Sequence, residues 1–465
     1  MVVSISKNKK IYSFEYTDFK FQPTIFTLKS PTMKKSYLLF FIVLTILNVF
    51  DLVNNSASCQ DTRYVRKQLQ ILCSPEMHGR GYYNRGDSIA AFYIADQFRK
   101  LGIRSFTGDF IQRHDFNVNR INRTVVKFNG QELKFNRDYV VSPYSASVKG
   151  TFKPVIINAS LMQNPDKFLA MVNGAPAPKV VVLDSSGLKN PTLYKFIRAL
   201  ATGKELGIAA LIEVFPTTPG TYPGRWQDKA AEIKIGKPAL PDTLSEVELE
   251  IEGEYIEHYP TQNVVGYLPG ETRQYIVFTA HYDGYGSYGE GNYNAAAEDN
   301  GSGTAMVMDL ARHYMKGKKP YYSTAFMLFS GEEAGLMGSK YYVTHPEFPL
   351  DKIKLVINLD MVMTGQDGVI LFNGNGRPNE AAIVQKINEE HQYMKNVENR
   401  DGTANSDHYP FQEKGVPAIF FLTKGPSGRG HGPDDTYDKL PMYAYENLFK
   451  LVVAIPEELK KQEIH

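Results

Sequence analysis

Short apolar runs alternate with segments of helical spacing along the second half of the chain. The runs with the length and residue types of buried strands are 275–280, 323–329, 354–359 and 417–422. The segments with helical spacing are 304–314, 336–345, 380–393 and a last one from about residue 442. This alternation predicts a three-layer α/β/α sandwich with a mostly parallel mixed sheet, because crossover helices cover both faces of such a sheet.

A helix and then a β-rich segment precede this half of the chain. The apolar positions with helical spacing are Ala91, Ile94, Ala95, Phe98 and Leu101, and Gly102 follows them as a stop signal. Strand-like runs at 179–184 and 208–214, with turns rich in proline and glycine around 216–224, mark the next segment. The sequence therefore predicts a β-rich domain at 115–257, inserted between the two parts, 59–114 and 258–465, of a larger domain.

The N-terminal 58 residues have the pattern of an export signal. Lys34 and Lys35 precede an apolar run from Leu38 to Phe50, and small residues follow at 56–58. The run is shorter than the roughly 17–25 residues of a membrane-spanning helix. Residues 1–58 are therefore expected to be an N-terminal extension and signal peptide, with Met33 as a second candidate for the start of translation.

Cys59 leaves two fates open for the exported chain. It follows three small residues, which resembles a bacterial lipoprotein box, although Ser56 stands where a leucine is usual. The protein is then either released into the periplasm or the medium, or held at a membrane through a lipid on Cys59.

Composition narrows the classes of function. The chain has 52 Lys+Arg and 50 Asp+Glu, so its formal net charge of +2 does not favour nucleic acid as a partner. A mean hydropathy of −0.32 excludes a protein with many membrane spans. Two cysteines, Cys59 and Cys73, are too few for a disulfide framework or a thiolate zinc module. Any metal must therefore be bound by His, Asp and Glu.

Such side chains follow the predicted strands at their carboxyl ends. They are His281 and Asp283, Asp299 in the next loop, Glu332 and Glu333, Asp360, and His431 beyond the last strand. Open α/β sheets bind their ligands at this edge. Each residue alone could be a helix cap or an acidic first turn. Their placement at successive strand ends instead favours a metal site, and the mixture of imidazole and carboxylate suits zinc.

At these residues the sequence resembles the M28 family of zinc-dependent metallopeptidases, the dizinc aminopeptidases. The matching motifs are His281-Tyr-Asp283, Glu298-Asp-Asn-Gly-Ser-Gly303, Gly331-Glu-Glu-Ala-Gly-Leu-Met-Gly-Ser339, Asn358-Leu-Asp-Met361 and His431-Gly-Pro-Asp-Asp-Thr-Tyr-Asp438. The segment at 115–257 is similar to the protease-associated insert of many members. The resemblance implies peptide substrates and an exopeptidase of the aminopeptidase type.

The resemblance also implies a role for each matching residue. One zinc would be held by His281 and Asp360, a second by Glu333 and His431, with Asp299 bridging both. Asp283 would accept a hydrogen bond from the free ring nitrogen of His281. Glu332 would be the general base that takes a proton from the attacking water and passes it to the leaving amine.

Two features keep alternatives open. Gly430 stands where many members have an aromatic residue before the last histidine ligand, and Tyr409 is the substitute candidate for binding substrate. A glutaminyl-peptide cyclotransferase with a single zinc is similar in fold and ligand positions, and a peptidase-like binding domain is a third alternative. The motifs at 297–303 and 333–339 resemble the peptidases more closely, which favours hydrolysis.

Overall fold

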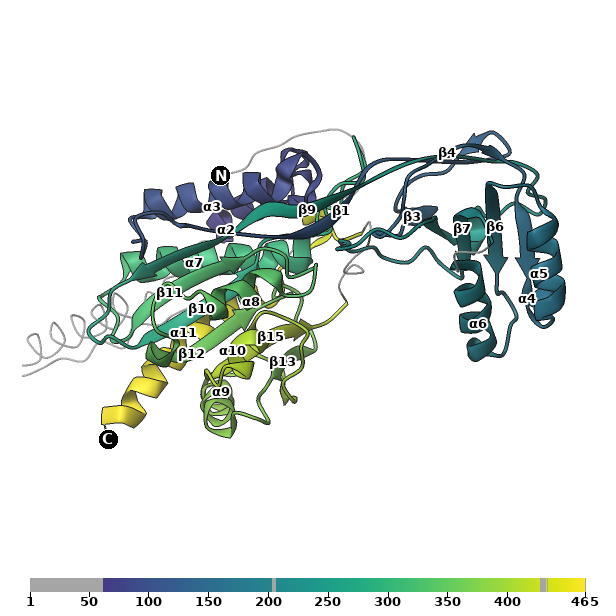
Figure 1. Ribbon diagram of the computed structural model, residues 1–465. Helices are drawn as coiled ribbons and strands as arrows, with labels where there is room; N and C mark the ends of the chain where they lie inside the picture. The colour runs from purple at the N-terminus through teal and green to yellow at the C-terminus, as the bar shows by residue number, and fades with distance from the viewer. Residues whose placement is uncertain (1–61, 203–205, 427–431, 433, 465) are drawn as a thin grey trace, which may run out of the picture. The chain divides into compact units, whose positions relative to one another are not determined.

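The computed structural model describes residues 62–202, 206–426, 432 and 434–464 (Figure 1). The expected export signal, Met33, Cys59, Gly430 and the expected zinc ligand His431 lie outside these residues. No helix within the described ranges combines the length and the apolar character needed to cross a membrane.

A ten-stranded mixed sheet carries the strand ends that the sequence singles out. Its order is β14-β13-β15-β12-β10-β11-β9-β1-β2, and β4 pairs with β9 beside this path. The strands are β1 (Ile111–Phe128), β2 (Gln131–Glu132), β4 (Val148–Phe152), β9 (Val247–Leu268), β10 (Tyr275–His281), β11 (Ser323–Phe329), β12 (Ile353–Leu359), β13 (Gly368–Phe372), β14 (Val397–Asn399) and β15 (Ala418–Lys424). The four strands expected from the sequence, β11, β10, β12 and β15, are adjacent and parallel. Their carboxyl ends therefore meet at one edge.

Helices cover both faces of the central strands. One face packs against α2 (Thr62–Leu72), α3 (Gly86–Leu101), α7 (Gly303–Lys316), α9 (Pro378–His391) and α11 (Tyr445–Ile464). The other packs against α8 (Met337–Thr344) and α10 (His408–Glu413). Successive residues of β10 alternate between these layers: Phe278 belongs to the first and Val277 to the second. The predicted three-layer α/β/α fold is confirmed.

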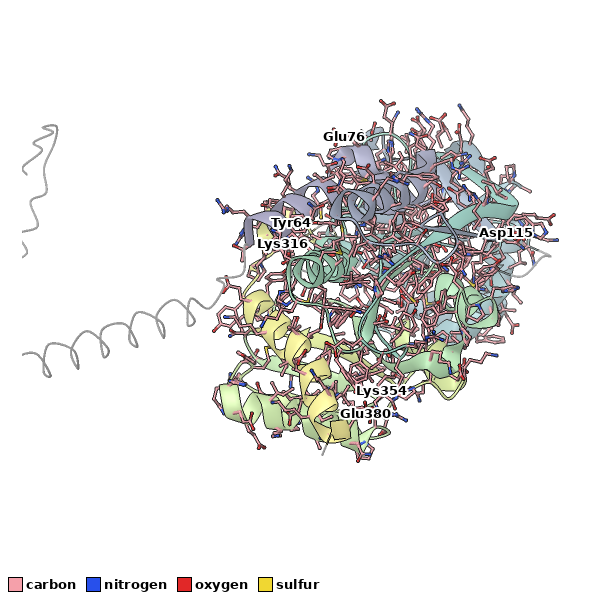
Figure 2. The ribbon with its side chains drawn as sticks, turned by 90° about the vertical axis from the view of Figure 1, so that its left-hand side faces the viewer. Tyr64, Glu76, Asp115, Lys316, Lys354 and Glu380 are labelled. Carbon is pink, nitrogen blue, oxygen red and sulfur yellow. The ribbon has the colours of Figure 1, made fainter. Side chains whose placement is uncertain are left out.

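The N-terminal helix α2 was not expected, and it packs on α7. Arg312 of α7 lies over the ring of Tyr64 at 4.5 Å from its centroid. Figure 2 shows Tyr64 beside Lys316, at the end of α7. The segment before the insert thus completes the helical layer of the main sheet.

The insert has a sheet of its own, in the order β3-β8-β7-β6-β5. The strands are β3 (Tyr139–Val141), β5 (Val155–Asn158), β6 (Lys179–Asp184), β7 (Ile208–Phe215) and β8 (Ala231–Gly236). The two runs expected here as strands are β6 and β7. The helices α4 (Ala159–Met162), α5 (Pro165–Gly174) and α6 (Pro191–Thr202) were not predicted. The expected domain boundaries, residues 115 and 257, lie within the long antiparallel strands β1 and β9, so this division of the chain stays a prediction.

Asp87 joins α3 to β9 by two buried hydrogen bonds. Its carboxylate accepts from the Tyr259 hydroxyl and from Thr261 Oγ1, each at 2.8 Å. Burial raises the pKa of Asp87 to about 6, against the partial opposition of these donors. An ionised Asp87 is therefore less stable in the folded chain than in the unfolded one.

The free energy of unfolding should accordingly depend on Asp87 between about pH 4 and pH 6. The folded state holds this proton more tightly than the unfolded state, so the stabilisation is present at the low end of the window and is lost as pH rises. In the wild type, Asp87 should lower the free energy of unfolding by about 3 kcal/mol between these pH values, at 1.36 kcal/mol per pKa unit. Asp87→Asn should abolish this decrease. Urea unfolding in EDTA across this range measures it. The control is Asp96→Asn on the same helix, whose partly exposed carboxylate pairs with Lys100. Equal slopes for Asp87→Asn and the wild type would contradict the assignment.

Candidate metal centre

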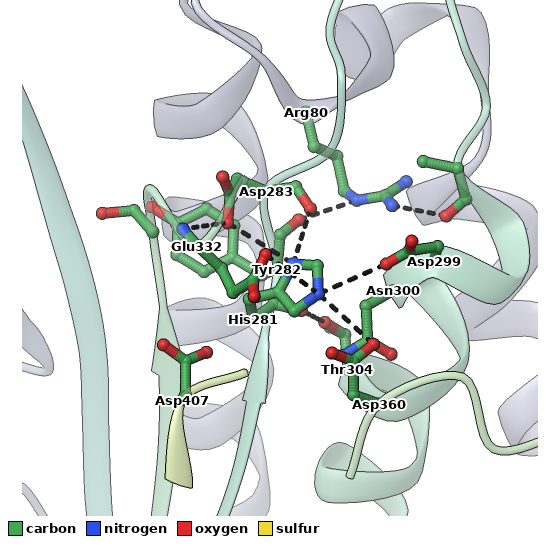
Figure 3. A network of polar contacts seen from close by, with 12 residues as sticks. Arg80, His281, Tyr282, Asp283, Asp299, Asn300, Thr304, Glu332, Asp360 and Asp407 are labelled. Atoms are coloured by element: carbon green, nitrogen blue, oxygen red, sulfur yellow. Dashed lines mark hydrogen bonds and ion pairs between the residues drawn. The ribbon is translucent and has the colours of Figure 1, made fainter. Parts of the chain in front are cut away.

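The end of β10 places an imidazole among carboxylates. His281 is almost fully buried, and its Nε2 lies 3.4 Å from Asp299 Oδ1 and 3.4 Å from Asp360 Oδ1. Figure 3 shows these side chains pointing toward one another from β10, from the turn before α7 and from the end of β12. The structure thus brings together three of the predicted zinc ligands.

Asp299 lies in the irregular turn η4 (Ala297–Ser302), which the neighbouring Asn300 fixes. Asn300 donates to the carbonyl of Leu359 at 3.0 Å and accepts from the amide of Gly303 at 2.8 Å. A side chain at Gly303 would meet the Leu359 carbonyl at 2.1 Å, so only glycine fits there. The segments that carry Asp299 and Asp360 are therefore held against each other.

Asp435 supports the same turn from the C-terminal part of the chain. Its carboxylate accepts from the amides of Glu298 at 2.7 Å and Asp299 at 3.1 Å. Burial raises the pKa of Asp435 to about 6, although these two amides lower it. The residue lies in the motif that begins at His431, and this contact joins Asp435 to the turn of Asp299.

A chain of hydrogen bonds orients Asp360. Thr279 Oγ1 donates to Asn358 at 2.6 Å, Asn358 donates to Ser406 Oγ at 2.8 Å, and Ser406 donates to Asp360 Oδ2 at 2.7 Å. Because Oδ2 is used in this way, Oδ1 is left facing His281 Nε2. Ser406 lies in the motif that contains Tyr409, but its role as the partner of Asp360 was not predicted.

Glu332 and Glu333 follow β11 in a tight turn that begins at Gly331. Gly331 has φ +67°, and the amides of Gly335 and Leu336 both donate to the Glu332 carbonyl, at 2.7 and 2.9 Å. The carboxylate of Glu332 lies 3.9 Å from His281 Nε2. Ligand atoms of His281, Glu332 and Glu333 lie within 4.8 Å of one another, so this pair faces the same imidazole.

Asp283 connects β10 to this turn. His281 Nδ1 lies 3.2 Å from the backbone oxygen of Asp283 and 3.5 Å from its carboxylate, and that carboxylate accepts from the amide of Glu332 at 3.2 Å. Asp283 is therefore within reach of His281, as expected, and its main-chain oxygen is the nearer acceptor.

Arg80 is a buried residue that the sequence did not single out. Its guanidinium donates to four carbonyls, of Leu72, Tyr282, Ala295 and Ala296, at 2.6–2.9 Å. Tyr282 follows the candidate ligand His281, and Ala296 directly precedes the turn of Asp299. The only local signal is its position between two glycines, Gly79 and Gly81, which pack against the backbone of Gly286.

Tyr285 and Tyr409 differ in whether they bond to the candidate ligands. Tyr285, not predicted, is buried beside the metal centre; burial raises its pKa well above the usual value, and Asp299, its hydrogen-bond acceptor, raises it further. Tyr409 is half-buried, and among the described residues no hydrogen bond joins its hydroxyl to the candidate ligands. Its role in binding substrate stays a prediction.

The clustered carboxylates perturb one another and His281. Burial lowers the pKa of His281, but the charges of Asp360 and Glu332 outweigh this effect and raise it well above normal. Burial also raises the pKa values of Glu332 and Glu333, and the carboxylates beside each raise them further. This crowding is typical of sites that bind a cation.

The donor set fits a divalent metal ion. His281 Nε2 and Asp360 Oδ1 are buried, face each other and form no hydrogen bond of normal geometry. Polar atoms in this state are costly unless an ion occupies the space between them. One nitrogen with carboxylate oxygens is a zinc donor set, and Asp299 and Glu333 each offer an oxygen within 4.8 Å of a ring nitrogen of His281.

The chain is similar in sequence to known aminopeptidases. Residues 263–455 match the sequence model of peptidase family M28. Aminopeptidase YwaD of Bacillus subtilis is 28% identical over 215 residues, which cover 44% of this chain and 46% of that protein. A probable leucine aminopeptidase of Arthroderma otae is 28% identical over 192 residues, covering 37% and 50%. The chain thus spans about half the length of these curated relatives.

Solved structures share the fold over a larger part of the chain. A zinc aminopeptidase from Bacillus subtilis aligns with a TM-score of 0.64 at 21% identity, covering 86% of this chain and 95% of that one. A peptidase M28 precursor from Shewanella amazonensis aligns with a TM-score of 0.60 at 18% identity, covering 86% and 93%. The part of the chain that matches the model of peptidase family M28, residues 263–455, includes His281 through Asp360.

Ser406→Ala should weaken metal binding by about 10- to 100-fold, because Asp360 loses the donor that fixes its orientation. Ser339→Ala is the matched control: it also removes a buried serine–aspartate bond, at 2.5 Å to Asp407, which is not a predicted ligand. Competition with a zinc chelator measures both affinities. The assignment fails if the two variants bind zinc equally well.

Proposed function

We propose that this chain is an exported, zinc-dependent aminopeptidase that hydrolyses the N-terminal peptide bond of peptides. The observation that carries the proposal is the convergence of His281 Nε2 with Asp299 Oδ1 and Asp360 Oδ1 in a buried site. The M28 family match and the names of the relatives support the same reaction class. Export rests on the sequence pattern at 34–58 alone.

The residues divide into two metal sites in this proposal. One zinc would be held by His281 and Asp360 and a second by Glu333 and His431, with Asp299 shared. A zinc pair would acidify a bound water and polarise the peptide carbonyl. Asp283, beside His281 Nδ1, would keep the imidazole in the tautomer that leaves Nε2 free to bind metal.

Glu332 is the general base of the proposed reaction. Its carboxylate faces His281 at 3.9 Å, and its backbone is held by the turn at 331–336 and by Asp283. A carboxylate so placed accepts the proton of the attacking water and donates it to the leaving amine nitrogen. The reaction thus needs no covalent bond between the chain and its substrate.

Active protein should contain about two zinc ions per chain. Asp299→Ala should remove both, because its carboxylate is shared, whereas His431→Ala should weaken one site preferentially. Elemental analysis together with chelator titration distinguishes the two. A single tight zinc in active protein would contradict the dizinc assignment and favour the cyclotransferase alternative.

Glu332→Gln separates catalysis from metal binding. The amide keeps the size of the side chain but cannot accept a proton, so zinc content should be nearly unchanged. Turnover of leucine anilide should fall by about 10²–10⁴-fold. Glu333→Gln should lose zinc as well as rate, since an amide oxygen is a poorer ligand. Wild-type turnover by a zinc-loaded Glu332→Gln protein would refute the mechanism.

A further inference from the structure

The insert contains a cavity of about 610 Å³ that no part of the proposed reaction uses. This volume lies within the range of small-ligand sites. Side chains of α6, β8 and the loop that follows β7 line it. It is lined by aromatic groups and by charged side chains of both signs.

The aromatic wall is built around Trp226. One face of the indole stacks on Tyr144, with ring centroids 3.9 Å apart and planes at 11°, and Tyr222 meets Tyr144 edge-on at 6.0 Å. Trp226 is nevertheless 48% exposed and Tyr222 37% exposed. A supported but half-exposed indole offers a flat apolar surface to a ligand at little cost in side-chain entropy.

The remaining wall carries charged side chains of both signs, and its cations are Arg198, Lys229 and Lys234. Arg198 is matched by carboxylates that it binds directly, Glu213 at 3.1 Å and Glu232 at 2.7 Å. Lys229, Lys234 and Asp228 also line the cavity. Within the described ranges neither lysine forms an ion pair. The cavity therefore suits an apolar group that carries a carboxylate nearby.

The loop that carries Trp226 contacts two segments that follow candidate site residues in the sequence. Tyr288, seven residues after His281, bonds Thr221 Oγ1 at 2.6 Å and the Tyr222 carbonyl at 3.2 Å. Arg225 Nη1 lies 3.4 Å from the sulfur of Met337, just beyond the Glu332-Glu333 turn.

Gly224 fixes the loop between these anchors. Its carbonyl accepts from the amide of Asn119 at 2.8 Å, and a Cβ there would meet the Pro143 carbonyl at 2.2 Å. The loop on one side of the cavity is thus held by contacts to β1, to Tyr288 and to the start of α8.

We propose that this cavity binds the downstream part of the peptide substrate. An apolar side chain packs on Trp226, and the α-carboxylate of the peptide lies near Lys229 and Lys234. This inference rests on the proposed aminopeptidase function and extends it to substrate length. Peptides that reach the cavity bind more tightly, whereas an amino-acid anilide does not use it.

Intrinsic fluorescence tests the site directly, because Trp226 is the single tryptophan of the chain. The probes are leucine-headed peptides of two to eight residues with phenylalanine next to the C-terminus, added to zinc-loaded Glu332→Gln protein. A saturable change in emission should appear above a threshold length and weaken when the C-terminus is amidated. A change with none of the peptides, or an equal change with free leucine, would overturn the proposal. Fluorescence needs no turnover, so it shows whether peptides bind in the cavity even if the protein hydrolyses nothing.

Steady-state kinetics of Trp226 variants provides a second test of the site. Trp226→Ala should raise KM for the bound octapeptide at least tenfold, leave kcat nearly unchanged and leave leucine anilide hydrolysis unaffected; Trp226→Phe should restore most of the affinity. Phe196→Ala is the matched control, since Phe196 lies on α6 of the same insert and is 49% exposed. Equal effects of Trp226→Ala on the octapeptide and the anilide would contradict the site. Absence of wild-type anilide turnover would instead count against the proposed function.

Discussion

The carboxylates around His281 repel one another, and the rest of the site depends on how that repulsion is offset. Asp299, Asp360, Glu332 and Glu333 approach one imidazole in a region with little water to screen them. Burial and mutual repulsion raise the pKa values of the two glutamates. One imidazolium cannot balance this many negative charges, whereas divalent ions can. The electrostatics of these residues thus favours a site for divalent cations.

Hydrogen bonds from distant parts of the chain hold these charges in place. Arg80 ties the backbone after His281 to the turn of Asp299, Ser406 sets the orientation of Asp360, and Asp435 holds the amide of Asp299. The segment at 62–102 precedes the region of the family match, yet it supplies Arg80 and two helices of the sheet's covering layer. The metal centre is therefore a product of the whole fold rather than of residues 263–455 alone.

The parts of this architecture that could be predicted are those with a local signal. Uninterrupted apolar runs predict β10, β11, β12 and β15. A polar residue directly after a buried strand lies at the edge of the sheet, so its position could be predicted as well. The role of Arg80 could not be predicted, because its partners are backbone carbonyls at residues 72, 282, 295 and 296. The insert helices α5 and α6 did have a signal, an asparagine cap followed by proline at 164–165 and 190–191. The strand-like runs on either side of these helices dominated the prediction, so this helix signal was missed.

Anomalous diffraction at the zinc absorption edge, on crystals of the zinc-loaded chain, tests the central claim most directly. We expect one peak bound by His281 Nε2, Asp360 and Asp299 at about 2.0–2.2 Å, and a second that shares Asp299 and contacts Glu333. Peaks confined to other surfaces, or an empty space between His281 and Asp360 in zinc-loaded protein, would contradict the account.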